Sequence, residues 1–148
     1  MKTIGLIGGM SWESSAQYYR LINEGVRDRL GGVHSARSLM ISVDFGEIER
    51  MQHAGDWPAL TDQMIEAAQA LERGGADFLL LCTNTMHRMA GNVAESVSIP
   101  LLHIADPTAE AILGRPQVCR PARNRLHDGA GLLQGPADRA VRAAGVDA

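Results

Sequence analysis

Short apolar runs alternate with longer amphipathic segments over most of this 148-residue chain. The apolar runs are rich in Ile, Val, Leu and Phe, which predicts buried strands. They are residues 3–7, 38–43, 77–81 and 99–104. The segments between them carry apolar residues at helical spacing and are predicted to be helices over residues 12–30, 47–53, 57–73 and 85–96. This order predicts an α/β fold, with a parallel sheet and helices on both faces.

The loops that follow these strands are expected to meet at one edge of the sheet, because the carboxyl ends of parallel strands lie together. They are residues 8–11, 43–45, 82–85 and 104–107. Ligands of α/β proteins bind in the crevice beyond these ends, where helix N-termini direct their free N–H groups. The sequence therefore predicts the functional site at this edge.

The loop after the third strand begins with a cysteine, Cys82. A helix N-terminus and nearby donors can hold a thiol in this place as a thiolate, which would make it a base or nucleophile. A core cysteine followed by a helix cap is an equally open interpretation, because free cysteine is among the most buried residue types. The enzymatic interpretation requires the sulfur to lie at an opening, close to the glycine turn at residues 8–9.

Composition and charge exclude several classes of protein. Hydrophobic residues make up 45% of the chain, enough for a core, and the net charge of −3 gives no sign of nucleic-acid binding. No apolar run approaches the ~18–20 residues that a membrane span needs, and the N-terminus lacks a signal-peptide pattern. The two cysteines, Cys82 and Cys119, lie in different contexts and suggest no disulfide. The sequence therefore predicts a soluble, cytoplasmic protein.

Residue spacing disfavours nucleotide and metal sites. The arrangement Gly5-x-x-Gly8-Gly9 does not match G-x-G-x-x-G, and no Gly-Lys-Ser/Thr follows it. The five histidines are scattered, and none is paired with an acidic neighbour in a zinc arrangement. We therefore predict neither a nucleotide-binding domain nor a metal site.

Several motifs at the predicted edge together resemble the aspartate/glutamate racemase family, and most of all its broad-specificity amino-acid racemase branch. They are residues 4–14 (IGLIGGMSWES), 18–20 (YYR), 22–24 (INE), 42–45 (SVDF), 82–87 (CTNTMH) and 103–106 (HIAD). The resemblance covers residues 1–113, in order and with natural spacing. The agreement of several motifs at once is stronger evidence than any one of them alone.

The resemblance implies cofactor-independent racemisation at the α-carbon of an acidic or related amino acid. A thiolate removes the α-proton from one face, and a second cysteine returns a proton to the other face, as inversion requires. Cys82 matches the first cysteine. The positions that match substrate-binding residues are Met10, Ser11, Thr83, Asn84 and Thr85 for the carboxylate and ammonium groups, and Gln52 for the side chain. An amide at position 52, rather than an arginine, argues against tight selection of aspartate alone.

The second cysteine of the family belongs to a later half-domain, and this sequence shows no such half. Cys119 lacks both the preceding buried strand and the following Thr/Asn loop. We therefore expect residues 1–113 to form one racemase-like half-domain with impaired activity toward a small amino acid. Relatives are commonly dimeric, which makes a homodimer a further expectation. A non-catalytic amino-acid-binding module or an unstable remnant is the alternative.

The pattern changes after residue 113. Residues 114–148 contain no Ile, Phe, Tyr, Trp or Met, and are expected to be a loosely ordered, irregular tail with a short helix over residues 136–144. If the codons of residues 114–147 are read one base later, a choice of synonymous codons permits a strand, a Gly-rich turn and a helix. These elements resemble the start of the family's second half. A one-base slip near Leu113 is therefore our hypothesis, and a natural lineage-specific tail is the alternative. The nucleotide sequence of the gene distinguishes the two.

Overall fold

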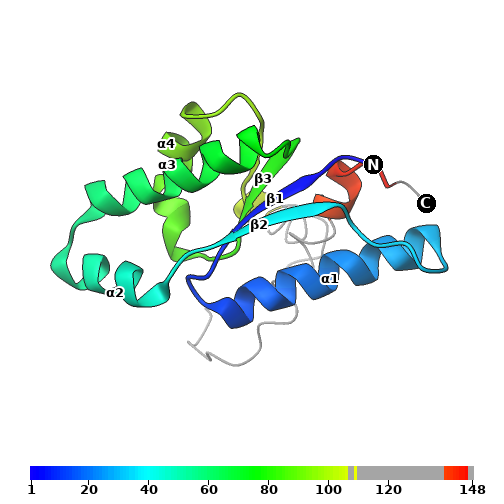
Figure 1. Cartoon of the computed structure of the whole chain (residues 1–148), viewed down its shortest axis with the longest axis horizontal. Helices are drawn as coiled ribbons and strands as arrows, with labels where there is room; N and C mark the ends of the chain where they lie inside the picture. The colour runs from blue at the N-terminus through cyan, green and yellow to red at the C-terminus, as the bar shows by residue number, and fades with distance from the viewer. Residues whose placement is uncertain (107–108, 110–138, 147–148) are drawn as a thin grey trace.

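A computed structural model describes residues 1–106, 109 and 139–146 of the chain (Figure 1). Its strands are β1 (Ile4–Gly8), β2 (Ser38–Ser42), β3 (Phe78–Leu81) and β4 (Leu101–Leu102). Its helices are α1 (Trp12–Leu30), α2 (Phe45–Ala54), α3 (Trp57–Arg73), the 3-10 turn η1 (Thr85–Met89) and α4 (Ala90–Glu95). Strands and helices thus alternate along the chain as the sequence predicts.

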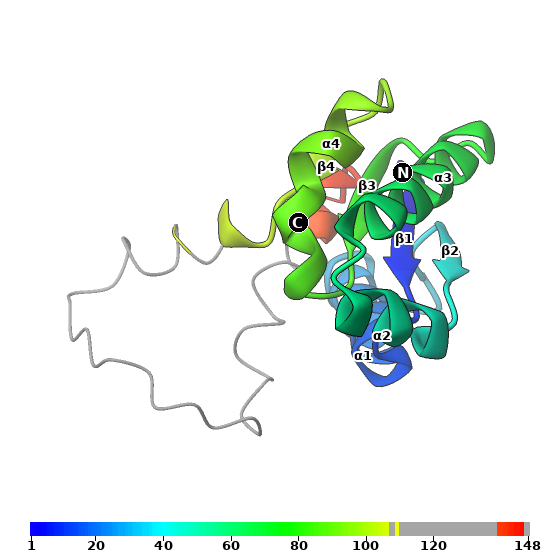
Figure 2. The same ribbon diagram turned by 90° about the vertical axis from the view of Figure 1, so that its left-hand side faces the viewer.

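The four strands form one parallel sheet in the order β2-β1-β3-β4. Figure 2 shows this order, with β4 and α4 at one side and β2 at the other. α1 covers one face of the sheet, and α2, α3 and α4 cover the other (Figure 1). The predicted α/β fold with helices on both faces is therefore confirmed.

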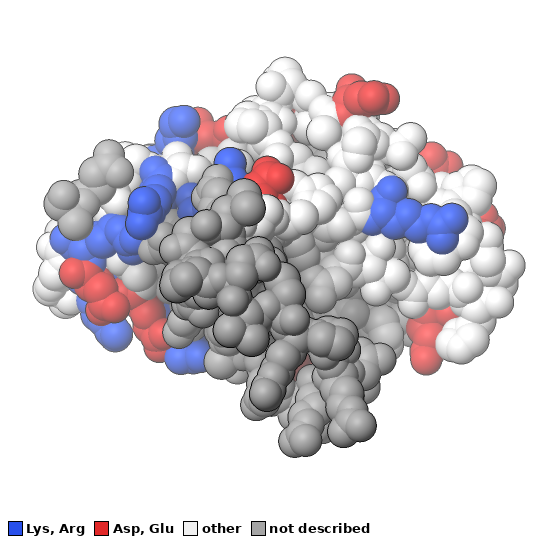
Figure 3. Space-filling view, turned by 180° about the vertical axis from the view of Figure 1, so that it is seen from behind, with Lys and Arg blue, Asp and Glu red and all other residues white. Residues whose placement is uncertain are grey.

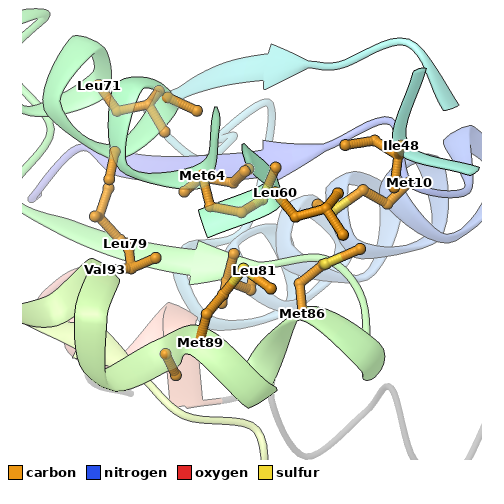
Figure 4. Close-up of a cluster of buried hydrophobic side chains, with 14 of the residues drawn as sticks. Met10, Ile48, Leu60, Met64, Leu71, Leu79, Leu81, Met86, Met89 and Val93 are labelled. Carbon is orange, nitrogen blue, oxygen red and sulfur yellow. The ribbon is translucent and has the colours of Figure 1, made fainter. Parts of the chain in front are cut away.

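Alternation along the strands divides the core into two clusters. Successive side chains of a strand point to opposite faces, so Leu79 and Leu81 of β3 pack under α3, whereas Phe78 and Leu80 pack under α1. The cluster on the α3 side is drawn in Figure 4. Both clusters are closed to solvent, which fixes the register of the central strands, because a slip by one residue would turn every apolar side chain to the wrong face.

Helix caps explain why the longest helices begin where the sequence predicts. The Ser11 side chain accepts a hydrogen bond from the backbone N–H of Ser14, and α1 begins at the next residue, Trp12. Asp56 accepts one from Ala59 at the start of α3. The bounds of both helices agree with the predicted ones. α2 is longer than the predicted 47–53.

Two predicted elements are shorter or less regular than expected. The predicted helix over residues 85–96 is split into η1 and α4, because Met89 adopts φ −108 and ψ 14 between them. The predicted strand over residues 99–104 is reduced to the two residues of β4. Pro100 has no N–H to donate, and the ring of His103 accepts from Ala105, which turns the chain away from the sheet.

Within the tail, a short helix lies where the sequence predicts one, over part of residues 136–144. Residues 139–143 are helical, and Ala140, Val141 and Ala144 are buried against the face of the sheet that α1 covers. The backbone N–H of Lys2 donates to the carbonyl of Ala144 at 2.8 Å. Small residues spaced three and four apart form the apolar stripe that this helix buries. The predicted boundary at residue 113 and the reading-frame hypothesis lie outside the described residues.

Charged side chains of both signs lie together on the molecular surface. On the face that Figure 3 shows, Lys and Arg are intermingled with Asp and Glu over the described residues. Ion pairs such as Arg20 with Glu24, at 2.9 Å, are of this exposed kind. Among the helices of the described residues, none is long and apolar enough to cross a membrane.

Candidate functional site

The strand order reverses between β1 and β3. From β1 the chain passes to β2 on one side, and from β2 it crosses over to β3 on the other side. In α/β proteins such a reversal marks the carboxyl ends of the two central strands as the place where ligands bind. β1 ends at Gly8 and the loop after it begins at Gly9, whereas the loop after β3 begins at Cys82. The structure therefore brings the two predicted loops side by side.

The turn after β1 is held by a buried serine of α1. Ser15 is 3% exposed, and its hydroxyl oxygen accepts from the N–H of Gly9 at 2.9 Å. The same hydroxyl donates to the carbonyl of Ser11 at 3.1 Å. A side chain at Gly8 would meet the Ser15 hydroxyl, so the turn and the helix can approach this closely only with glycine there. The sequence analysis did not identify Ser15, although its position four residues after the cap is the signal that could have found it.

We expect Ser15→Ala to lower the free energy of unfolding by about 1–3 kcal/mol, because the buried N–H of Gly9 would lose its acceptor. Chemical denaturation of the two proteins measures this difference. Ser14→Ala, which removes a hydroxyl from the next position of the same helix turn, is the matched control and is expected to change stability far less. Equal effects of the two substitutions would contradict the role given to Ser15.

Cys82 lies beside the glycine turn but is buried. Its backbone N–H donates to the carbonyl of Ile7 at 2.9 Å, so the β3 geometry continues one residue beyond the strand. Strand alternation then directs its side chain to the same face as Phe78 and Leu80, into the cluster that contains Tyr18 of α1. Cys82 is 0% exposed. The enzymatic interpretation requires the sulfur to lie close to the glycine turn and at an opening. The first condition is met, and the second is not.

Burial determines the protonation of the thiol. The apolar surroundings raise the pKa of Cys82 to about 12, since they disfavour the charged thiolate. The pKa of Tyr18 is also raised, first by burial and then by the charge that Cys82 would carry. The expected stabilisation of a thiolate by a helix N-terminus is therefore absent from this conformation. A thiol of this kind is a strong base once ionised, but it is seldom ionised near neutral pH.

The loop after Cys82 is more open. Thr83 is half-buried, and Asn84 and Thr85 are exposed. Asn84 stands at the start of η1 without a side-chain cap hydrogen bond. The carbonyl of Thr83 lies 2.7 Å from Nδ1 of His87, which is a contact that the spacing of four residues allows. The loop therefore places three polar side chains at the predicted edge next to Cys82.

The other predicted substrate-binding residues are in different surroundings. Met10 is buried beside Ile48 in the cluster on the α3 side (Figure 4), where its side chain serves packing. Ser11 is occupied as the cap of α1, and its hydroxyl also donates to Glu13 at 3.0 Å. Gln52 is half-buried on α2. The roles of these three residues toward a substrate stay predictions.

Two hollows open on the described surface. One, of about 480 Å³, lies between α1 and the edge strand β2. Its lining residues are Trp12, Ser15, Ala16, Tyr19, Ser38, Met40 and Ser42. The other, of about 360 Å³, is lined by Glu47, Arg50, Met51, Ala54 and Asp56 of α2 and its end. Neither hollow is lined by a predicted site residue. Within the described residues, no group of three His, Cys, Asp or Glu side chains could hold a metal ion.

Comparisons with known proteins agree with this arrangement. The Asp/Glu/Hydantoin racemase family model matches residues 7–120. A structure from Yersinia pestis, titled as a candidate Asp/Glu racemase, is 50% identical, covers 76% of this chain and 49% of its own, and has a TM-score of 0.74. An aspartate racemase homologue from Pyrococcus horikoshii is 34% identical, with the same coverage and a TM-score of 0.71.

A third structure supports the fold alone. The aspartate racemase of Picrophilus torridus is 17% identical, covers 99% of this chain and 93% of its own, and has a TM-score of 0.72. The chain spans about half the length of the Yersinia and Pyrococcus proteins. The family match includes the end of β1, the turn at residues 8–9, all of β3 and the loop at residues 82–85. The chain therefore belongs to the Asp/Glu/Hydantoin racemase family.

Proposed function

We propose that this chain binds a small amino acid at the carboxyl edge of the sheet and that Cys82 removes its α-proton. The observation that supports this most directly is the position of Cys82 at the carboxyl end of β3, where the strand order reverses, next to the glycine turn. The names of the similar structures, which refer to aspartate and to Asp/Glu racemases, suggest acidic amino acids as substrates. Gln52 offers an amide rather than a cation, which favours a range of side chains over aspartate alone.

Proton removal requires the thiol to leave its present surroundings. Because burial raises the pKa of Cys82 to about 12, the thiolate forms only when the loop at residues 82–85 opens or when a cationic group approaches. The ammonium group of a bound amino acid is such a cation. We propose that the substrate itself promotes ionisation, by placing its charge beside the loop and displacing the apolar contacts of the sulfur.

The proposed activity acts on one face of the α-carbon only. Inversion at the α-carbon needs an acid on the face opposite the base. Among the described residues Cys82 is the free cysteine, so we propose that the α-proton is removed and returned on the same face. The consequence is exchange with solvent hydrogen without appreciable racemisation.

Incubation of the purified chain with L-aspartate or L-glutamate in deuterated water tests this function. We expect the α-proton signal to decay in NMR spectra while the L-configuration persists on chiral chromatography. Rapid formation of the D-enantiomer would contradict the one-sided mechanism. A rise in melting temperature with either amino acid, but no exchange, would instead identify a binding module, an alternative that the buried thiol favours.

A further inference from the structure

The side chain of His87 connects the loop after β3 with the loop after β4. Nδ1 of His87 lies 2.7 Å from the carbonyl oxygen of Thr83, the residue after Cys82. Nε2 of the same ring lies 3.4 Å from the backbone nitrogen of Ile104, two residues after β4. This ring therefore connects the two loops beyond the short pairing of β3 with β4.

The two partners of His87 together specify its protonation. A carbonyl oxygen can only accept, so Nδ1 must carry the proton that bonds to Thr83. A backbone N–H can only donate, so Nε2 must offer its lone pair to Ile104. The ring is therefore neutral, with its proton on Nδ1. A second proton would abolish the contact with Ile104 and turn it into a repulsion between two donors.

The surroundings of the ring favour this neutral form. The pKa of His87 is lowered first by burial, and the neighbouring His103 lowers it further, although the hydrogen bond to Thr83 opposes both effects. The rings of His87 and His103 are 4.5 Å apart and meet edge to face. Other charged groups nearby are engaged elsewhere: Arg88 lies 4.3 Å over the ring of Trp57, and Asp106 is 3.8 Å from Arg139.

We propose that neutral His87 is a positioning residue that fixes the backbone leaving Cys82 and so keeps the thiol in the apolar cluster under α1, and that protonation of its ring releases the loop after β3. Thr83 is the point of attachment, because the backbone that leaves Cys82 passes directly through the carbonyl that His87 binds. The inference rests on the proposed function for the importance of Cys82. It concerns the accessibility of the thiol, which is measurable without turnover.

The reaction of Cys82 with dithiodipyridine, an aromatic disulfide that also reacts in acid, measures this accessibility. A Cys119→Ser background leaves Cys82 as the single thiol. His87→Asn keeps a donor near Thr83 but cannot reach Ile104, whereas His87→Ala loses both contacts. We expect the reaction to be about five-fold faster for each hydrogen bond lost, so about five-fold for Asn and 25-fold for Ala.

The pH profile distinguishes positioning from a merely structural effect. As the pH falls through the pKa of His87, the ratio of the wild-type rate to the His87→Ala rate should rise, because protonation releases the loop in the wild type only. Changes in the thiolate fraction and in the protonation of the probe affect both proteins alike and cancel in this ratio. His53→Asn is the matched control, since Nδ1 of His53 makes the same contact with a carbonyl four residues earlier, at 2.9 Å, on exposed α2. It should react like the wild type.

Unchanged thiol reactivity in His87→Ala, or the same pH profile in wild type and variants, would overturn the proposal. If the variants do not fold, nitrogen-15 NMR of the wild-type ring decides: a proton on Nε2 or a doubly protonated ring at neutral pH would also overturn it. A normal accessibility response without α-proton exchange would refute the proposed function and leave the role of His87 standing. Exchange of the α-proton without a change in thiol accessibility would support the proposed function and refute the role of His87.

Discussion

Cys82→Ser is expected to lower the rate of α-proton exchange by at least ~100-fold, the lower end of what a positioned general base contributes. Serine has nearly the volume of cysteine, so the surroundings of Tyr18 and Leu80 should be preserved. Its hydroxyl is a far weaker acid than a thiol and supplies almost no anion. The decay of the α-proton signal in deuterated water, followed by NMR, measures the effect.

The pH dependence of exchange adds a second criterion to this test. Since the pKa of Cys82 is raised to about 12, the thiolate fraction should increase about ten-fold for each pH unit below that value. The exchange rate of the wild type should therefore climb with pH across the neutral and mildly alkaline range. Cys119→Ser is the control that should leave the rate unchanged. Exchange that persists in Cys82→Ser would assign the base to another residue.

Gly9→Ala is expected to lower the free energy of unfolding by about 4 kcal/mol, the sum of the backbone strain of a left-handed alanine and the strain of overpacking. Gly9 has a φ of +90. An added Cβ would collide with the carbonyl oxygen of Val43 and lie 2.8 Å from the Ser42 hydroxyl. These groups belong to the end of β2, where Val43 donates to the carbonyl of Gly8 at 3.0 Å. The substitution would thus separate β1 from β2 at the functional edge.

Gly75→Ala separates backbone strain from overpacking as causes of the lower free energy of unfolding. Gly75 has nearly the same φ, +92, but an added Cβ there meets nothing within 4 Å. Its replacement should cost only the backbone strain, about 1–2 kcal/mol. Urea denaturation of the three proteins gives the comparison. If Gly9→Ala were no more destabilising than Gly75→Ala, the close approach of the turn to β2 would have no energetic importance.

Local signals explain the parts of the fold that the sequence predicts well. α1 and α3 begin after capping side chains and end near glycines, so their bounds follow from residues within one turn. The apolar runs that became β1, β2 and β3 are bounded by similar signals. β4 was overestimated because its extent depends on pairing with a four-residue neighbour, a contact between distant parts of the chain.

The sequence predicted that the two loops lie together, but it did not predict the burial of the thiol. The strand order brings the loop of Cys82 beside the glycine turn, as parallel strands require. The protonation of the thiol depends instead on which face its side chain enters and on what α1 places there. Alternation from Phe78 through Leu80 to Cys82 was visible in the sequence, and it indicates the face. The presence of Tyr18 at that face is a tertiary contact that no local pattern contains.

The hydrogen bond between Lys2 and Ala144 has a consequence for synthesis of the protein. The N–H of Lys2, just before β1, bonds to a residue that the ribosome adds 142 residues later. Until then, the sheet face beneath α1 lacks the cover that Val141 and Ala144 provide. A nascent chain therefore exposes apolar surface until residues 141–144 have been made, a state in which chaperones bind and aggregation begins. Contacts between the two chain ends also slow folding, because closing so long a loop must precede their formation.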